Sequence, residues 1–287
     1  MKSKTFLDEI RKSNLNNSDF EDIYTEFQNY QNKALECLKV FIEICEKNDI
    51  SYTLAYGSLL GAIRDNGQIP WDYDIDVFIK NQDKNKLISS LKKSLPEKYY
   101  FKCAEVDKNC RHLIIRLSPK NISTEVIHDD IFVLVGCPDD EKKRMKMQKE
   151  IVKLSKIRYY QLISPLYYGF SHPMFIIKTI LKKIPTLFLS KNGVLKKLIK
   201  LTNEYNVDDT KYCIHGDIWA MQYCFETSKI WKTKKIKLEN DLTVRVPENY
   251  DSLLKMMYGN YMDVPSLESR ISEVIEHHKF IKKNINN

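Results

Sequence analysis

Residues 56–64 read Tyr-Gly-Ser-Leu-Leu-Gly-Ala-Ile-Arg, and residues 69–77 follow one short loop later as Ile-Pro-Trp-Asp-Tyr-Asp-Ile-Asp-Val. On an extended backbone, side chains two positions apart project from the same face, so Asp74 and Asp76 are expected to point together. Two carboxylates on one face repel each other unless a cation lies between them. The stretch therefore predicts a metal-dependent chemistry on phosphate groups.

The pattern around this stretch predicts an α+β fold, with a small mixed sheet and flanking helices in the first half and a mainly helical second half. The expected helices cover 18–47, 59–65, 84–95 and 267–285, and the expected strands cover 50–56, 74–79, 99–104, 112–117 and 125–135. One hairpin, formed by 236–238 and 242–246, interrupts the helical half. We expect a catalytic core with an N-terminal helix over 1–140, and a helical, basic region that completes the active site over 141–287.

The composition is typical of a globular protein. The 287 residues are 43% hydrophobic and 29% charged, which is enough to bury a substantial core. The first 17 residues lack the apolar core of a signal peptide, and no window of about twenty apolar residues is present. Seven cysteines without a Cys-x-x-Cys pair predict reduced, mostly buried thiols in a cytoplasmic protein.

The basic charge is concentrated in one part of the chain. The formal net charge is +8, and residues 151–203 hold ten Lys or Arg but no Asp or Glu. Basic amphipathic segments such as 174–189 and 194–201 can lie on an anionic membrane, which would place the protein on the inner face of the plasma membrane. An ordinary helical subdomain with solvated lysines explains the pattern equally well, so both interpretations stay open. No recognised motif accompanies the charge, and a nucleic-acid partner is not expected.

Gly57 and Ser58 end the first predicted strand. Glycine at this place allows a sharp turn and close approach of a ligand, and the helix that follows offers unpaired N–H groups to a phosphate. When Gly57 and Ser58 are considered by themselves, a plain turn without a ligand is the simpler explanation. Next to Asp74 and Asp76 at the start of a core strand, phosphate and metal binding are favoured, because unpaired like charges would be costly there.

A third carboxylate is expected from the strand over 125–135. Asp129 and Asp130 would face opposite sides of a regular strand, so only one of them can join the site, and we prefer Asp130. Arg64 could hold a phosphate, and Trp71 could stack on a base or cover a cationic head group. A surface arginine and a packed tryptophan are equally good interpretations of these two residues.

Together these residues resemble a known family. G-S-L-L-G-A-I-R followed by I-P-W-D-Y-D-I-D-V is similar to the signature of the LicD-type transferases, a group that also includes fukutin-related proteins. The I-H-D-D-I-F run at 127–132 resembles that family's third acidic strand, and 246–254 with 258–261 resembles its C-terminal signature. The motifs extend from residue 51 to about residue 265 in the expected order. The resemblance implies a nucleotidyltransferase-like fold.

The resemblance also implies an activity. Family members move a phospho-alcohol, with phosphocholine the first expectation here, from a CDP-activated donor to a hydroxyl of a cell-surface glycan or its lipid-linked precursor. Such transfer modifies lipopolysaccharide, teichoic acid or capsule. The implied catalytic residues, which would also bind Mg²⁺ or Mn²⁺, are Asp74, Asp76 and Asp130, with Asp130 the first choice as base. The implied donor-binding residues are Gly57, Ser58, Arg64, Trp71 and Asp72.

One departure and three alternatives accompany this interpretation. The family often has Asp where this chain has Tyr73, which should point away from Asp74 and Asp76. A D-x-D glycosyltransferase, a true nucleotidyltransferase that releases pyrophosphate, and a non-enzymatic membrane-associated protein stay open. The early acidic pair after a Gly-Ser turn disfavours the first, and carboxylates crowded on a core edge disfavour the last.

Overall fold

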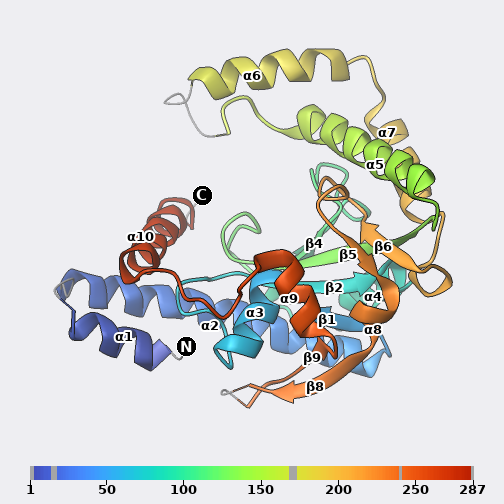
Figure 1. The fold of residues 1–287 in the computed structure, drawn as a ribbon. Helices are drawn as coiled ribbons and strands as arrows, with labels where there is room; N and C mark the ends of the chain where they lie inside the picture. Colours follow the sequence, from blue (N-terminus) through green and yellow to red (C-terminus); the bar gives the residue numbers. More distant parts are fainter. Residues whose placement is uncertain (1–2, 14–17, 168–172, 239–240, 286–287) are drawn as a thin grey trace.

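A seven-stranded mixed sheet organises the protein in the computed structural model, which describes residues 3–13, 18–167, 173–238 and 241–285 (Figure 1). The strands of this sheet are β1 (Tyr52–Leu54), β2 (Ile75–Lys80), β3 (Tyr99–Lys102), β4 (Ile115–Pro119), β5 (Asp129–Cys137), β6 (Tyr212–His215) and β7 (Cys224–Glu226). The main order is β1-β2-β5-β4-β3, and β6 pairs with the C-terminal part of β5 and with β7. The β2–β5 pair is parallel and every other pair in this sheet is antiparallel.

Helices surround the sheet, as the α+β prediction required. They are α1 (Ser3–Arg11), α2 (Ser18–Lys47), α3 (Tyr56–Arg64), α4 (Lys84–Ser94), α5 (Glu141–Leu162), α6 (Pro173–Lys183), α7 (Lys191–Thr202), α8 (Thr227–Trp231), α9 (Tyr250–Tyr258) and α10 (Leu267–Asn284). Three short 3₁₀ helices are η1 (Asn81–Asp83), η2 (Ile184–Thr186) and η3 (Val207–Asp209). The predicted hairpin is present as β8 (Thr233–Lys237) and β9 (Thr243–Pro247).

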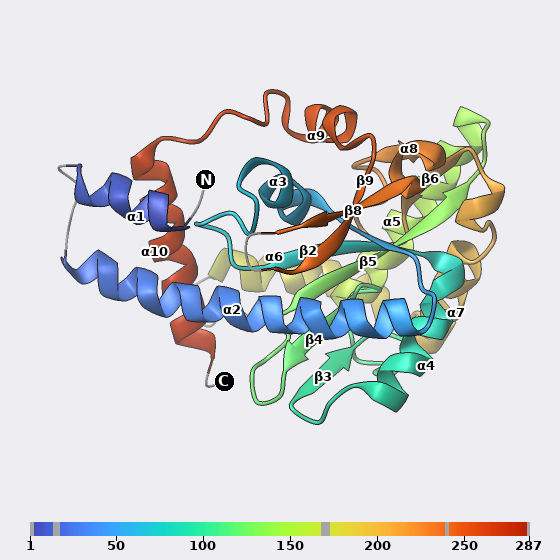
Figure 2. The same ribbon diagram turned by 90° about the horizontal axis from the view of Figure 1, so that it is seen from below.

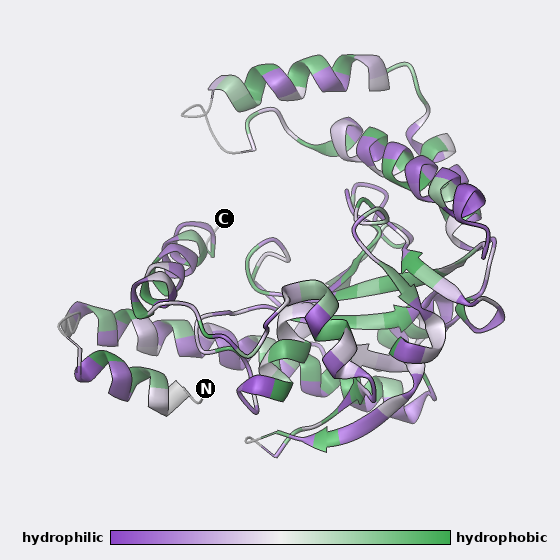
Figure 3. Ribbon diagram, viewed as in Figure 1, coloured by the Kyte–Doolittle hydropathy of each residue, from purple (hydrophilic) through white to green (hydrophobic). Residues whose placement is uncertain are grey.

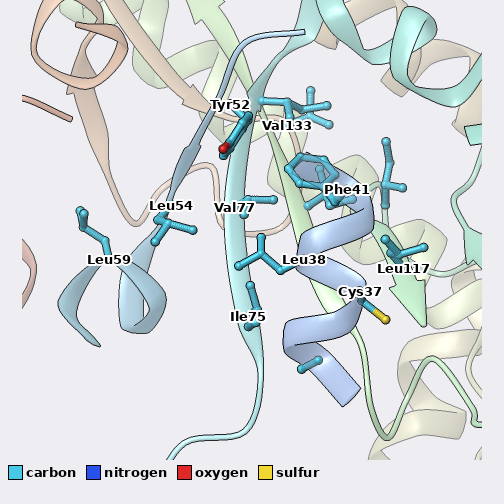
Figure 4. Packing of buried hydrophobic residues seen from close by; sticks show 14 of the residues in the cluster. Cys37, Leu38, Phe41, Tyr52, Leu54, Leu59, Ile75, Val77, Leu117 and Val133 are labelled. Atoms are coloured by element: carbon cyan, nitrogen blue, oxygen red, sulfur yellow. The ribbon is translucent and has the colours of Figure 1, made fainter. Parts of the chain in front are cut away.

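The long helix α2 covers one face of the sheet, where it contacts β2, β4 and β5, and Figure 2 shows it crossing in front of the sheet. Its apolar side chains repeat at helical spacing, and Leu38 and Phe41 pack against Val77 of β2 in Figure 4. Ile75, Val77 and Ile79 of β2 lie in the core on the α2 side, as predicted, and Phe78 is buried in a second apolar cluster on the other side. The intervening residues of β2 consequently face the opposite side of the sheet.

The second half of the chain is mainly helical, as predicted, but it also contains two strands that were not predicted. Strands β6 and β7 were not expected, because segments of four and three residues are too short to show a two-residue period. Since β6 pairs with β5, the sheet itself crosses the boundary that we placed at residue 140. That division into two parts stays a prediction.

The turn at Gly57 also differs from the prediction. Strand β1 ends at Leu54 and α3 begins at Tyr56, so the Gly-Ser pair lies within the first turn of the helix. The chain turns at Tyr56 instead, which adopts a positive φ of 43°. The Leu59 N–H already donates to the Ala55 carbonyl at 2.9 Å, which closes the first helical turn.

All seven cysteines are free thiols, and five of them are buried, as predicted. Within the described ranges, every helix is too short or too polar to cross a bilayer.

Candidate active site

A cavity of about 320 Å³ opens on the side of the sheet that α2 does not cover. Its lining residues are Tyr56, Asp74, Asp76, His112, Ile114, Arg116, Asp130, Phe132, Trp219 and Gln222, and we call it the acidic cavity. Three adjacent strands supply its floor, because Asp130 of β5 is in register with Asp76 of β2 and with Arg116 of β4. Residues in register share a face, so the three charged side chains lie side by side.

Asp130 is held as an ion pair. Its Oδ1 accepts a hydrogen bond from Arg116 Nε at 2.9 Å and lies 3.3 Å from His128 Nε2. Burial alone would raise the pKa of Asp130, but His128 and Arg116 lower it well below its usual value. Asp130 is therefore ionised and weakly basic at neutral pH.

Asp76 is a carboxylate whose charged form is disfavoured by its surroundings. Burial raises its pKa well above the usual value, and the charges of Asp74 and Asp130 raise it further. Its backbone N–H donates to Ser58 Oγ at 2.8 Å, which fixes the start of β2 against α3. The crowded carboxylates make this corner of the cavity attractive to a cation.

The donor set of the acidic cavity fits a hard divalent cation held by two carboxylates. Mg²⁺ prefers oxygen ligands and is commonly bound by one or two carboxylates together with substrate phosphates. Asp74 and Asp76 are of this kind, whereas Asp130 is engaged by Arg116 and His128. In the part of the chain that the structure describes, no group of three or more His, Cys, Asp or Glu is arranged to hold a metal. Metal binding by Asp74, Asp76 and Asp130 stays a prediction, with the geometry favouring the first two.

Gly57, Ser58 and Asp72 lie behind the acidic cavity and are not among its lining residues. A Cβ atom on Gly57 would approach Asp72 Oδ2 to 2.8 Å, so the glycine leaves room for this carboxylate. Burial and the charge of Asp74 raise the pKa of Asp72 well above its usual value. Gln31 Nε2 donates to the Asp72 carbonyl at 2.6 Å and anchors the loop to α2. These residues support the acidic loop, and direct contact with a donor stays a prediction.

Arg64 and Trp71 are placed elsewhere. Arg64 Nη2 pairs with Asp65 Oδ2 at 2.8 Å, and its guanidinium lies 5.4 Å from the Trp71 ring centroid. Trp71 is buried between Arg64 and Arg270 and packs 5.7 Å from Phe6. The packed-tryptophan interpretation therefore fits the structure, and the arginine is not at the surface. Neither residue lines the acidic cavity, so their predicted role in donor binding gains no geometric support.

Tyr73 packs away from the acidic cavity. Its ring lies 5.0 Å from His277 and 6.4 Å from Phe27, between α10 and α2. It is absent from the lining of the cavity. The substitution at this position leaves Asp74 and Asp76 on the cavity wall.

Several cavity residues had no sequence signal. Tyr56 OH contacts His215 Nε2, and the two rings stack at 5.7 Å, although they are 159 positions apart in the chain. Burial lowers the pKa of His215 to about 3, so this imidazole is neutral. Burial and Arg116 lower the pKa of His112 to about 4. The contact between Tyr56 and His215 depends on β6 joining the sheet, and the sequence pattern did not predict β6.

Comparison with known proteins agrees with this geometry. A family model described as "LicD/FKTN/FKRP, nucleotidyltransferase domain" matches residues 49–164. This chain carries a LicD-family domain. It is also 26% identical over 254 residues to "Lipopolysaccharide cholinephosphotransferase LicD" of Haemophilus influenzae (strain ATCC 51907 / DSM 11121 / KW20 / Rd), covering 83% of this chain and 91% of the relative. An uncharacterised protein of Rickettsia typhi (strain ATCC VR-144 / Wilmington) is 40% identical over 57 residues, 19% of this chain and 18% of its own length.

The LicD-family domain contains part of the acidic cavity. Asp74, Asp76 and Asp130 lie within residues 49–164, and so does Arg116. Trp219 and Gln222 come from the segment after β6. Most of the cavity wall therefore lies within the matched residues 49–164, and the second half of the chain adds Trp219 and Gln222.

Two buried acids lie next to the acidic cavity without lining it. Asp129 faces α2 and is 1% exposed, and both of its carboxylate oxygens lack a hydrogen-bond partner among the described residues. Burial and the charge of Asp130 raise its pKa well above the usual value. Asp217 accepts from the Trp219 N–H at 2.9 Å, and burial raises its pKa to about 7.

Asp217→Asn is expected to change how stability depends on pH. The folded state binds the Asp217 proton more tightly than the unfolded state, whose carboxyl titrates near 3.8. The stabilisation is complete below about pH 4 and is lost as pH rises to about 7, at up to about 1.4 kcal/mol per pH unit. The amide cannot ionise. The free energy of unfolding of the variant, measured with urea, should therefore increase relative to that of the wild type between pH 5 and pH 8. If the free energies of unfolding of variant and wild type differ by the same amount at pH 5 and pH 8, this assignment is contradicted. The Asp139→Asn variant, at an exposed position, is the control.

Proposed function

We propose that this protein is a phosphotransferase that moves phosphocholine from CDP-choline to a hydroxyl of a cell-surface glycan or its lipid-linked precursor. The observation that carries the proposal is the acidic cavity, in which two crowded carboxylates lie beside Arg116 within a LicD-family domain. The relative from Haemophilus influenzae, named as a lipopolysaccharide cholinephosphotransferase, supports phosphocholine as the first candidate. Other CDP-alcohols fit the same chemistry.

The reaction exchanges one P–O bond for another. The acceptor hydroxyl oxygen forms a bond to the phosphorus that carries the alcohol, and the bond from that phosphorus to the CMP oxygen breaks. The electron pair leaves with CMP, and the hydroxyl proton passes to a cavity group. A general base works best when its pKa lies near the operating pH. The lowered pKa of Asp130 therefore argues against our expectation that it acts as the base.

Other residues of the cavity have separate roles in the reaction. Arg116 is oriented by Asp130 and can offer its other N–H groups to a donor phosphate. Asp74 and Asp76 would hold a divalent cation, which when bound neutralises charge on the donor diphosphate. Phe132, Ile114 and Tyr56 supply an apolar wall that limits water around the reacting groups.

Product analysis tests the proposal against its alternatives. The protein is incubated with a panel of CDP-alcohols, a glycan acceptor and Mg²⁺, and the released nucleotide is identified. CMP release with CDP-choline is expected, together with loss of activity in EDTA and recovery on adding Mg²⁺. In parallel incubations, pyrophosphate release from CTP would indicate nucleotidyl transfer, and turnover of a nucleotide sugar would indicate a glycosyltransferase. No turnover of any nucleotide donor would favour a non-enzymatic protein.

A further inference from the structure

The edge of the protein formed by α5, α6 and η2 carries an exposed apolar stripe. Five large side chains repeat at intervals of three and four residues, and this spacing places the three within α6 on one side of that helix. They are Met174, Ile177, Leu181, Ile184 and Phe188, with exposed fractions of 62%, 51%, 64%, 49% and 88%. Figure 3 shows the green of α6 at the outer margin of the molecule, away from the sheet. An exposed apolar surface of this size usually marks a site of contact with a membrane, a ligand or another protein.

Hydrogen bonds hold this segment in place. Gln161 Nε2 at the end of α5 donates to the Thr186 carbonyl at 3.0 Å and the Leu189 carbonyl at 2.8 Å. Lys183 Nζ donates to the Ile163 carbonyl at 2.8 Å. Thr179 is buried on the opposite side of α6 from the stripe. The apolar side chains are therefore presented outward by a fixed element.

A second stripe, of lysines, follows the exposed side of α5. Its members also repeat at intervals of four and three residues and are Lys142, Lys146, Lys149, Lys153 and Lys156. A groove of about 640 Å³ separates α5 from α6 and is lined by three of these lysines together with Lys182. Leu181 and Tyr160 line the same groove. Cationic and apolar groups thus alternate across the whole edge.

We propose that the α5–α6 edge docks on a bilayer that contains anionic phospholipid. The apolar stripe enters the boundary between head groups and acyl chains, and the lysine stripe contacts lipid phosphates. Charge complementarity favours this occupant over a second copy of the chain. Residues 151–203 contain no acid, and the acids of α5, Glu141 and Glu150, are outnumbered by its lysines, so two such edges would repel each other. The contact is peripheral, in keeping with the lack of a membrane-crossing helix in the described ranges.

Docking at this edge would bring the acidic cavity close to the membrane. Met221 lines the α5–α6 groove, whereas Trp219 and Gln222 of the same segment line the acidic cavity. Gln148 Nε2 of α5 donates to the Ala220 carbonyl at 2.8 Å and holds this segment to the edge. If the proposed transferase activity holds, a lipid-linked acceptor anchored in the same bilayer could present its hydroxyl to the cavity.

Vesicle flotation tests the proposal with the full chain. Phosphatidylcholine vesicles are compared with vesicles that contain about 30% phosphatidylglycerol, at about 0.05 M and about 0.5 M NaCl. We expect binding to the anionic vesicles at low salt, weaker binding at high salt and little binding to phosphatidylcholine alone. No flotation with anionic vesicles at low salt would overturn the proposal.

Two double variants locate the contact. Leu181→Ser with Phe188→Ser, and Lys149→Glu with Lys156→Glu, should each weaken partitioning by about tenfold or more. Exposed positions elsewhere provide matched controls, namely Met262→Ser with Phe280→Ser and Lys92→Glu with Lys93→Glu. Equal losses in the test and control variants would contradict docking through this edge.

Two further measurements separate the remaining outcomes. Sedimentation velocity without vesicles should show a monomer, and a dimer dissociated by Leu181→Ser with Phe188→Ser would indicate self-association instead. Flotation does not depend on catalysis, so Asp76→Asn should float like the wild type. The edge variants should keep their rate of CMP release with a soluble acceptor, so failure of docking and failure of the transferase proposal are distinguishable.

Discussion

Asp76→Asn is expected to lower the rate of CMP release from CDP-choline by at least about a thousandfold, and Asp74→Asn should do the same. Each substitution removes one of the two carboxylates that the cavity offers to a divalent cation. The loss corresponds to about 4 kcal/mol of transition-state stabilisation. The rate is measured with saturating donor and Mg²⁺, beside the exposed Asp139→Asn variant, which should retain full activity.

Unfolding of the same variants separates catalysis from folding. Burial and two neighbouring carboxylates disfavour the charge of Asp76, so the neutral amide should leave the thermal midpoint unchanged or raise it. A folded Asp76→Asn protein that releases CMP at the wild-type rate would refute the assignment. Loss of both activity and fold would instead show that Asp76 is needed for the structure.

Gly61→Ala is expected to destabilise the protein by at least about 2 kcal/mol, although alanine normally favours a helix. A Cβ atom at this position would lie 2.6 Å from the Gly67 carbonyl oxygen and 2.9 Å from the Ile69 backbone nitrogen. Both obstacles are backbone atoms, so relief requires the loop to move. That loop leads directly to Asp72 and Asp74, and CMP release should fall as well.

Gly67→Ala is the matched control for this prediction. No heavy atom lies within 4 Å of a Cβ built on Gly67, so its cost should stay within about 0.5 kcal/mol. Urea unfolding and CMP release are measured for both variants. Equal stability of the two would show that the close packing of α3 against the loop does not control the position of the acidic residues.

The central strands and the face of their acids could be predicted because both follow from local patterns. Alternation of polar and apolar residues from Asp74 to Val77 is a property of a few neighbouring residues, and the structure reproduces it at the start of β2. The same argument preferred Asp130 to Asp129, and only Asp130 lies on the cavity wall. Sequence spacing alone was sufficient for these features.

Predictions that depended on tertiary contacts were less accurate. The Gly-Ser pair was expected to face a phosphate, yet Ser58 accepts from the Asp76 backbone and Gly57 makes room for Asp72. Arg64 and Trp71 precede the acidic motif closely in sequence, but they pack in a separate cluster with Phe6 of α1 and Arg270 of α10. Which neighbour a side chain meets was decided by helices far away in the chain.

The sequence by itself determined that carboxylates would gather on one face at the start of two core strands, because side-chain direction repeats every two residues along any strand. Only the tertiary structure decided their roles. It paired Asp130 with Arg116 across β4 and β5, left Asp74 and Asp76 on the cavity wall, and closed the cavity with Trp219 and Gln222. The physical reason is that burial and partner charge set the pKa values of Asp76 and Asp130, and both depend on which strands pair in the folded sheet.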